Sequence, residues 1–561
     1  MQLVAYGAQD VYLTGNPQIT FWKVTYRRHT NFAMESIEQT FNGQADFGRR
    51  VTCTISRNGD LAYRTYLQVT LPEINQTMAN TVNPGTVSDG VYARWLDFPG
   101  EQMISQVEVE IGGQRIDRQY GDWMHIWNQL TLTKEQERGY FKMVGNTTQL
   151  TFICDPSFAA INSPCTTNAG SNQVCQPRNA LPETTLYVPF QFWYCRNPGL
   201  ALPLIALQYH EVKINLDIRP IDECLWAVST LNNGAVANSN SSGLLKVTKA
   251  YQQSLVAASL YVDYVFLDTD ERRRMAQNPH EYLIEQLQFT GDESVGSSSN
   301  KIKLNFNHPC KELIWVVQPD VNVDYCGSLT SGNLLYSTLG AQPFNYTDSI
   351  DALPNAIHSF GGNQAVAGST GAFINGSGLF ADPEAWDAVY SSGGPSWNSG
   401  TAVGGLWYST EQMQAPGGVA GIQAQPAPES LVSDAGTFVM AEASVDMHCW
   451  GQNPVVTAKL QLNGQDRFSE REGTYFDLVQ PYQHHTRAPD TGICVYSFAL
   501  RPEEHQPSGS CNFSRIDNAT LQLVLSNATV QGTNTAKVRV YAVNYNVLRV
   551  MSGMGGLAYS N

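Results

Sequence analysis

Short runs in which hydrophobic and polar residues alternate recur along the whole chain, and this period of two predicts antiparallel β-strands. In the first half the runs are 32–41, 51–56, 63–71, 104–111, 186–194, 210–218 and 260–267. In the second half they are 282–289, 302–306, 313–317, 455–462, 493–500, 519–525 and 538–547. Helical patterns are few: residues 122–140 form the longest, and 268–279 form a short charged connector.

The strand pattern also repeats itself about 350 residues apart. Val107–Arg115 and Ala458–Asp466 both lead through alternating residues into a turn, Gly-Gly-Gln in the first and Asn-Gly-Gln in the second. A repeat this long indicates two copies of a domain, because solenoids repeat every 20–50 residues. Strand number and spacing fit the all-β class, with two tandem eight-stranded antiparallel jelly-roll sandwiches, long loop insertions and a few short helices.

The same pattern predicts how the chain divides. We expect an N-terminal segment at 1–30, a first jelly roll at 31–268, a linker at 269–281 and a second jelly roll at 282–561. An insertion at about 320–450 interrupts the second jelly roll. No Lys or Arg occurs between Lys311 and Lys459, whereas 13 Asp and Glu residues do. Scattered Trp and Phe residues predict that this insertion is folded.

The amino-acid composition excludes some classes of function. Only 15% of the 561 residues are charged, and the net charge of −16 argues against nucleic acid as the main partner. No apolar run reaches the ~18–20 residues of a membrane span, and no secretory signal is visible. Eleven cysteines without a Cys-x-x-Cys pair fit a chain made in a reducing compartment.

The sequence contains no motif that identifies a catalytic or ligand-binding site. No Gly-x-Ser-x-Gly, His-Glu-x-x-His or phosphate-binding loop occurs. His484-His485, with Asp477 and Asp490 nearby, is the best metal candidate, but adjacent histidines on a strand point to opposite faces and chelate poorly. We therefore expect no catalytic, cofactor-binding or metal-binding residues and no enzyme activity.

Six segments in order resemble the double jelly-roll major capsid proteins of the nucleocytoplasmic large DNA viruses, including those of giant amoebal and algal viruses. They are Tyr63–Val69, Ile111–Asp117, Trp193–Leu204, Asp268–Arg274, Glu281–Gln286 and Asn512–Asp517. The resemblance implies a homotrimeric capsomer whose six jelly rolls form a pseudo-hexagonal tile of an icosahedral shell. It also implies neighbouring capsomers and minor capsid proteins as partners, and a virion made and assembled in the host cytoplasm. The alternative from the fold alone is a two-domain lectin or carbohydrate-active protein.

Two basic clusters gain a role from this resemblance. Lys23, Arg27, Arg28 and His29 would lie beneath the tile, where they would contact minor capsid proteins or an internal membrane surface; a solvated terminal patch is the alternative. Arg272, Arg273 and Arg274 lie in the linker and are expected to fix the two domains by pairing with carboxylates such as Asp268, Asp270 or neighbours of Glu271 across the joint.

The large insertion is expected on the outer surface of the shell. A segment without cations is poorly suited to holding DNA or an anionic membrane. Among the Asn-x-Ser/Thr sequences of the chain, Asn345 and Asn375 lie in this insertion and are the candidate glycosylation sites.

Overall fold

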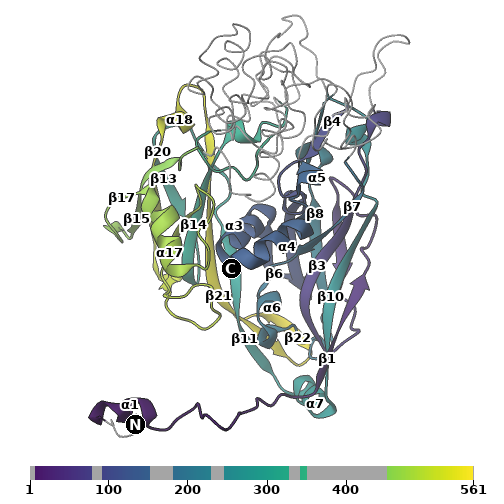
Figure 1. Ribbon diagram of the computed structural model, residues 1–561, viewed down its shortest axis with the longest axis vertical. Coiled ribbons are helices and arrows are strands. Elements are labelled where there is room, and N and C mark those ends of the chain that lie inside the picture. The colour runs from purple at the N-terminus through teal and green to yellow at the C-terminus, as the bar shows by residue number, and fades with distance from the viewer. Residues whose placement is uncertain are drawn as a thin grey trace, which may run out of the picture.

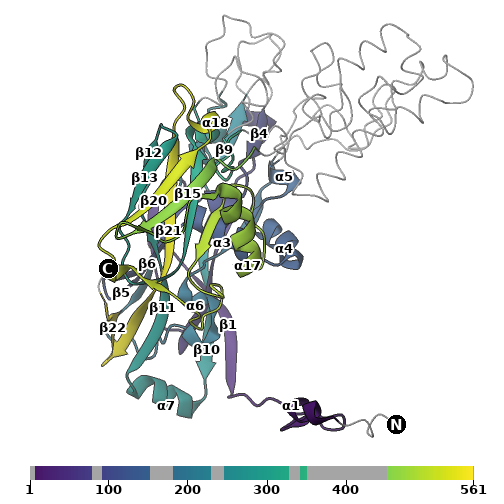
Figure 2. The same ribbon diagram turned by 90° about the vertical axis from the view of Figure 1, so that its left-hand side faces the viewer.

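The computed structural model of the protein describes residues 7–78, 91–151, 181–228, 246–326, 341–349 and 451–559. Two β-sandwiches stand side by side, with helices α3 (Gly121–Thr131) and α4 (Lys134–Val144) between them (Figure 1). Most strands run along the long axis of the molecule in both views (Figures 1 and 2).

The first sandwich consists of two four-stranded antiparallel sheets. The order of one sheet is β1 (Phe32–Gln39), β10 (Ala257–Leu267), β3 (Leu61–Leu71) and β7 (Thr184–Pro189). The order of the other is β2 (Arg50–Thr54), β8 (Val212–Ile218), β5 (Ile104–Ile111) and β6 (Gln114–Tyr120). A separate two-stranded sheet pairs β4 (Tyr92–Trp95) with β9 (Leu225–Val228).

The second sandwich repeats this arrangement. Its first sheet runs in the order β11 (His280–Phe289), β21 (Ala536–Met551), β14 (Pro309–Pro319) and β18 (Cys494–Ser497). The short strands β12 (Glu293–Val295), β19 (Cys511–Asn512) and β22 (Met554–Leu557) extend it. The facing sheet runs β13 (Ser299–Leu304), β20 (Ala519–Leu525), β15 (Val455–Leu462) and β16 (Gln465–Asp466), and β17 (Arg471–Glu472) pairs with β15.

Strand order identifies both sandwiches as the same fold. When the eight main strands of each are numbered in chain order, both have one sheet ordered 1-8-3-6 and one ordered 2-7-4-5. This is the arrangement of a jelly roll, in which successive strands alternate between two antiparallel sheets except at the central hairpin of strands 4 and 5. The prediction of two tandem eight-stranded jelly rolls is confirmed.

The repeated turn occupies the same place in both sandwiches. Gly112 and Gly113 connect β5 to β6, and Asn463 and Gly464 connect β15 to β16. All four residues have positive φ, from 51° to 86°. A two-residue hairpin of this kind needs left-handed backbone at both positions, which explains the Gly-Gly and Asn-Gly pairs.

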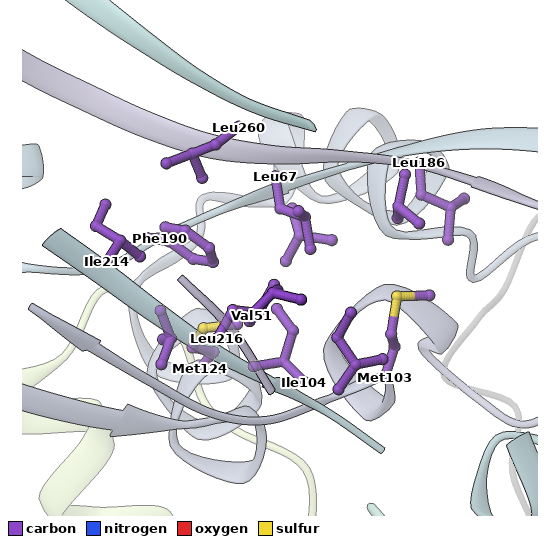
Figure 3. Close-up of a cluster of buried hydrophobic side chains, with 14 of the residues drawn as sticks. Val51, Leu67, Met103, Ile104, Met124, Leu186, Phe190, Ile214, Leu216 and Leu260 are labelled. Carbon is purple, nitrogen blue, oxygen red and sulfur yellow. The ribbon is translucent and has the colours of Figure 1, made fainter. Parts of the chain in front are cut away.

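Alternating residues from both sheets fill the core of the first sandwich. On β3 the inward residues Leu67, Val69 and Leu71 are at most 1% exposed. They meet side chains of the facing sheet such as Ile104 and Leu216 (Figure 3). Burying each side chain of this size contributes about 1.5–3 kcal/mol. The equivalent residues of the second sandwich form a separate core that includes Trp315 and Phe476.

The helices differ in one respect from the sequence expectation. The single helix predicted over 122–140 is two helices, α3 and α4, because Leu132 and Thr133 are extended. Helix α7 (Thr269–Gln277) connects β10 to β11 and is capped by the Asp268 side chain, which accepts from the Thr269 amide. The remaining α-helices of the described residues are single turns: α1 (Val11–Thr14), α2 (Pro99–Gln102), α5 (Thr148–Thr151), α6 (Trp193–Arg196), α17 (Gln480–His484) and α18 (Asn527–Val530).

The two ends of the molecule are distinct. Helix α7 and the N-terminal segment lie at one end, whereas β4 and α18 lie at the other (Figures 1 and 2). Most of the predicted 320–450 insertion lies outside the described residues, and Asn375 lies there too. Its described flanks start at the α18 end, because the Asp320 amide donates to the carbonyl of Thr535 near α18. They also lie close together, because the Gln452 amide donates to Asp348.

Candidate interdomain joint and assembly surfaces

An apolar cluster joins the two sandwiches through residues far apart in the sequence. Trp123 of α3 lies with its ring centroid 5.4 Å from that of Tyr541 on β21, and Phe289 of β11 stacks on Tyr541 at 4.8 Å. Phe98 meets Phe344 edge-on at 5.9 Å. The rest of this joint comes from α3, α4, β14, β18, β21 and two loop residues, Tyr346 and Ile493: the element residues are Ile126, Trp127, Leu130, Tyr140, Phe141, Val144, Ile314, Val316, Val495 and Val543. Such a continuous core holds the sandwiches at one fixed angle.

Charged pairs surround this apolar joint. Arg539 of β21 donates to Asp122 of α3 at 2.7 Å and to Asp292 at 2.7 Å. Burial alone would lower the pKa of the Arg539 guanidinium, but the Asp122 and Asp292 carboxylates outweigh it and raise the pKa. Arg487 of the second sandwich likewise reaches Glu137 of α4 at 2.8 Å. Partly buried pairs of this kind are costly to break one partner at a time.

A third set of contacts lies beside β11. Arg196 of the first sandwich lies 3.2 Å from Glu285, which also accepts from the buried Lys311 at 2.7 Å. Asp117 of β6 is 4% exposed and accepts from the Leu287 amide at 3.2 Å. Burial raises the pKa of Asp117 to about 7. Sequence reasoning missed all these pairs, because their members are far apart in the chain.

The linker arginines behave differently from the expectation. Arg272 pairs with Asp60 of the first sandwich, with Nη2 3.0 Å from the carboxylate oxygen. Asp268 caps α7 instead of pairing with an arginine. The described residues include no ion pair for Arg273 or Arg274, which are exposed. Among the three arginines, therefore, only Arg272 pairs with a carboxylate in the described chain, and the partner is neither Asp268 nor Asp270.

His484 and His485 do not lie on a strand, as the sequence analysis assumed: His484 ends helix α17 and His485 caps it, and the two side chains have different partners. His485 is enclosed between two carboxylates, with Nε2 2.9 Å from Glu312 and Nδ1 2.9 Å from Glu503. Burial alone would lower the pKa of His485, but Glu312 and Glu503 outweigh it and raise the pKa to about 9. His484 instead lies 3.1 Å from the carbonyl of Leu500. His485 therefore forms a buried ion pair, whereas His484 makes an exposed contact with the backbone.

The N-terminal arm, residues 7–31, combines basic and apolar side chains. Lys23, Arg27, Arg28 and His29 are all exposed. Large apolar residues, which the sequence patterns did not single out, lie between and around them. Their exposed fractions are 91% for Ile19, 102% for Phe21, 87% for Trp22, 72% for Val24 and 84% for Tyr26. Apolar surface of this extent on an extended segment is typical of segments that bind a partner.

Comparisons with known proteins agree with this architecture. A family model described as large eukaryotic DNA virus major capsid protein matches residues 271–556, and one described as major capsid protein N-terminus matches residues 20–268. The chain belongs to the major capsid proteins of large eukaryotic DNA viruses.

Individual relatives match over the whole chain. The chain is 77% identical to the major capsid protein of Phaeocystis pouchetii virus, over 100% of this chain and 99% of the relative. It is 74% identical to that of Chrysochromulina ericina virus, with the same coverage. A chain from a quasi-atomic model of the PBCV-1 virus capsid is 32% identical and superposes with a TM-score of 0.57, covering 97% of this chain and 100% of that one.

Family membership settles the broad function. This major capsid protein is a structural component of the virion shell, and the lectin alternative has no support from the comparisons. Within the described residues, no group of three or more His, Cys, Asp or Glu side chains is arranged to hold a metal ion. In the same residues, no helix has the length and hydrophobicity needed to span a membrane.

Asn345 is not an accessible glycosylation site in this capsid protein. The residue is 3% exposed, and its side-chain nitrogen donates to Gln342 at 2.7 Å and to the carbonyl of Ser349 at 3.0 Å. Its side-chain oxygen accepts from Thr347. A nitrogen that donates twice inside the fold cannot be reached by a glycosyltransferase. The Asn345 side chain therefore has a structural role in the fold, and the expectation of a glycan there is wrong.

Proposed function

We propose that three copies of this chain form a homotrimeric capsomer, in which six jelly rolls make a pseudo-hexagonal tile of the icosahedral shell of a large double-stranded DNA virus. The fixed interdomain joint carries this proposal. Two copies of one fold, held at one angle by the cluster around Trp123 and Tyr541, supply one third of a near-sixfold ring. The chain acts by self-assembly and has no enzyme activity of its own.

The N-terminal arm would face the interior of the shell. Its location beside α7, at the end opposite β4 and α18, supports this orientation (Figures 1 and 2). There Lys23, Arg27, Arg28 and His29 would contact minor capsid proteins or an internal membrane, with the neighbouring aromatic residues contributing apolar area. The 320–450 insertion would face outward, since its described flanks start at the α18 end.

The proposed capsomer also assigns a place to each part of the chain. An N-terminal segment at 1–30, which contains most of the arm, is followed by the first jelly roll at 31–268, the linker at 269–281 and the second jelly roll at 282–561. Assembly from newly made capsomers would take place in the host cytoplasm, and neighbouring capsomers would meet along the sides of the tile.

Sedimentation equilibrium at low micromolar concentration tests the trimer. Obligate interfaces bury more than ~2,000 Å², so we expect one species at three times the 61.9 kDa of the chain. A monomer, or a monomer–trimer equilibrium in that range, would contradict the proposal.

A further inference from the structure

The joint inside the chain is a helix-on-sheet contact. Helices α3 and α4 of the first sandwich cover the outer face of the β11-β21-β14-β18 sheet of the second (Figure 1). As a result, β14 is buried at every residue from Cys310 to Pro319, on both faces of the strand. On α3, the residues that make the contact are Trp123, Ile126, Trp127 and Leu130.

The second sandwich has its own version of this helix. A π-helical turn, Tyr475–Val479, continues into α17 and follows β17, as α3 follows β6. Phe476 points into the core of the second sandwich, as Met124 points into the core of the first. The apolar residues that follow Phe476 therefore correspond to the residues that follow Met124 in α3, and those α3 residues face the second sandwich.

Those residues repeat the spacing of α3 but are exposed. Leu478, Val479 and Tyr482 follow Phe476 by two, three and six positions, as Ile126, Trp127 and Leu130 follow Met124. Their exposed fractions are 57%, 38% and 86%. Helix α17 lies on the part of the second sandwich away from the first sandwich (Figure 1). The chain thus carries a second docking helix that has no sheet beneath its outer face among the described residues.

The first sandwich carries the matching sheet. The outer face of β1-β10-β3-β7 corresponds in strand order to the face that α3 covers. Burial alternates along β3, with the outward Arg64 exposed and Tyr66 and Gln68 half-buried. Tyr66 stacks on Tyr261 with centroids 5.4 Å apart and lies 6.3 Å from the 39% exposed Tyr187.

We infer that Leu478, Val479 and Tyr482 of one copy dock on the face formed by Tyr66, Tyr187 and Tyr261 of a second copy of this chain. The contact repeats between chains what α3 does within one chain. Tyrosine-rich, partly exposed faces are typical of the anchors that dominate interfaces. Because the two patches differ, the contact is head-to-tail, and it closes into a ring when the rotation permits. Closure at three copies rests on the proposed trimer.

The two patches can be inactivated separately. One variant, Leu478→Asp with Tyr482→Asp, removes the helix patch. The other, Tyr187→Asp with Tyr261→Asp, removes the sheet patch. The control is Met551→Asp, which places the same charge on a residue 50% exposed in the β21–β22 hairpin, away from α17 (Figures 1 and 2). Far-UV circular dichroism checks that each variant is folded, and Tyr482→Asp and Tyr187→Asp alone replace any double variant that is not.

Sedimentation equilibrium of each variant, and of their mixture, measures the oligomeric state. We expect each double variant to be monomeric at low micromolar concentration and the control to remain trimeric. Mixed one to one, the two variants should form a dimer and no trimer, because only one intact helix can meet one intact sheet. A trimer from either double variant would overturn the inference while leaving the trimeric function intact, and so would a mixture that stays monomeric. A wild-type monomer would instead overturn the trimer itself and this inference with it.

Discussion

Arg539 of the second sandwich donates to Asp122 of the first at 2.7 Å, although 417 positions separate them in the chain. The arginine side chain is 15% exposed and the aspartate 12%. Asp122 lies in the first turn of α3, and the next residue, Trp123, packs on Tyr541. The ion pair therefore borders the apolar joint, and both fix the angle between the sandwiches.

Breaking this pair should destabilise the joint. We expect Arg539→Met to cost about 3–5 kcal/mol, because it leaves the partly buried Asp122 and Asp292 carboxylates without their partner. Arg539→Met combined with Asp122→Asn should cost less than the sum of the two single changes. Urea unfolding of the four proteins measures the coupling free energy. Additive costs would show that the pair does not couple the sandwiches.

Stability should fall as the pH rises from about 7 to 9. The pKa of His485 is raised from 6.5 to about 9 by Glu312 and Glu503, so its contribution is complete below pH 6.5 and is lost as the pH passes 9. A shift of this size corresponds to about 3 kcal/mol. Asp117, with a pKa of about 7, also lowers stability as the pH rises, but only up to about pH 8, so the fall between pH 8 and 9 belongs to His485.

The variant His485→Gln isolates this effect. It should be less stable than the wild type at pH 6.5, and the difference should shrink toward pH 9. Thermal melting at half-unit steps of pH measures it. A difference that stays constant over the interval would contradict an imidazolium at this position.

The three linker arginines should differ in how much each contributes to the stability of the protein. Arg272→Ser should cost less than about 1 kcal/mol, because its pair with Asp60 is half-exposed and such pairs are weak. Arg273→Ser and Arg274→Ser should have no measurable effect on melting and serve as matched controls. Equal effects of all three changes would mean that the cluster acts through its net charge and not through the Asp60 contact.

The basic residues of the N-terminal arm should bind an anionic membrane surface. We expect Lys23→Glu, Arg27→Glu and Arg28→Glu together to weaken flotation with phosphatidylserine vesicles roughly a hundredfold, at about 1 kcal/mol for each cation lost. Arg138→Glu, an exposed charge change on α4, is the control. Wild-type protein that fails to float at low salt would exclude the membrane as the partner and favour a minor capsid protein.

The sequence predicts those features that depend on local pattern. Alternation predicts strands such as β3, and the pairs Gly112-Gly113 and Asn463-Gly464 predict both hairpins, because left-handed backbone favours these residues. The pattern over 122–140 predicts helix but not the break at Leu132 and Thr133, which propensity does not specify.

Features that depend on tertiary contacts could not be predicted in this way. The partner of Arg272 is Asp60, 212 positions away, and nearby carboxylates gave the wrong pairing. Asn345 carries an acceptor sequence for glycosylation, yet its burial follows from contacts with Gln342 and Ser349 that composition does not reveal. The exposed Phe21 and Trp22 could have been noted beside the basic cluster, since neither belongs to a predicted strand.

An electron cryo-microscopy reconstruction of the purified protein tests the trimeric capsomer most directly. It should show three copies around one axis, with six sandwiches in a near-hexagonal outline and the three N-terminal arms at the same end as α7. A single copy, a different number of sandwiches around the axis, or arms at the α18 end would contradict the account.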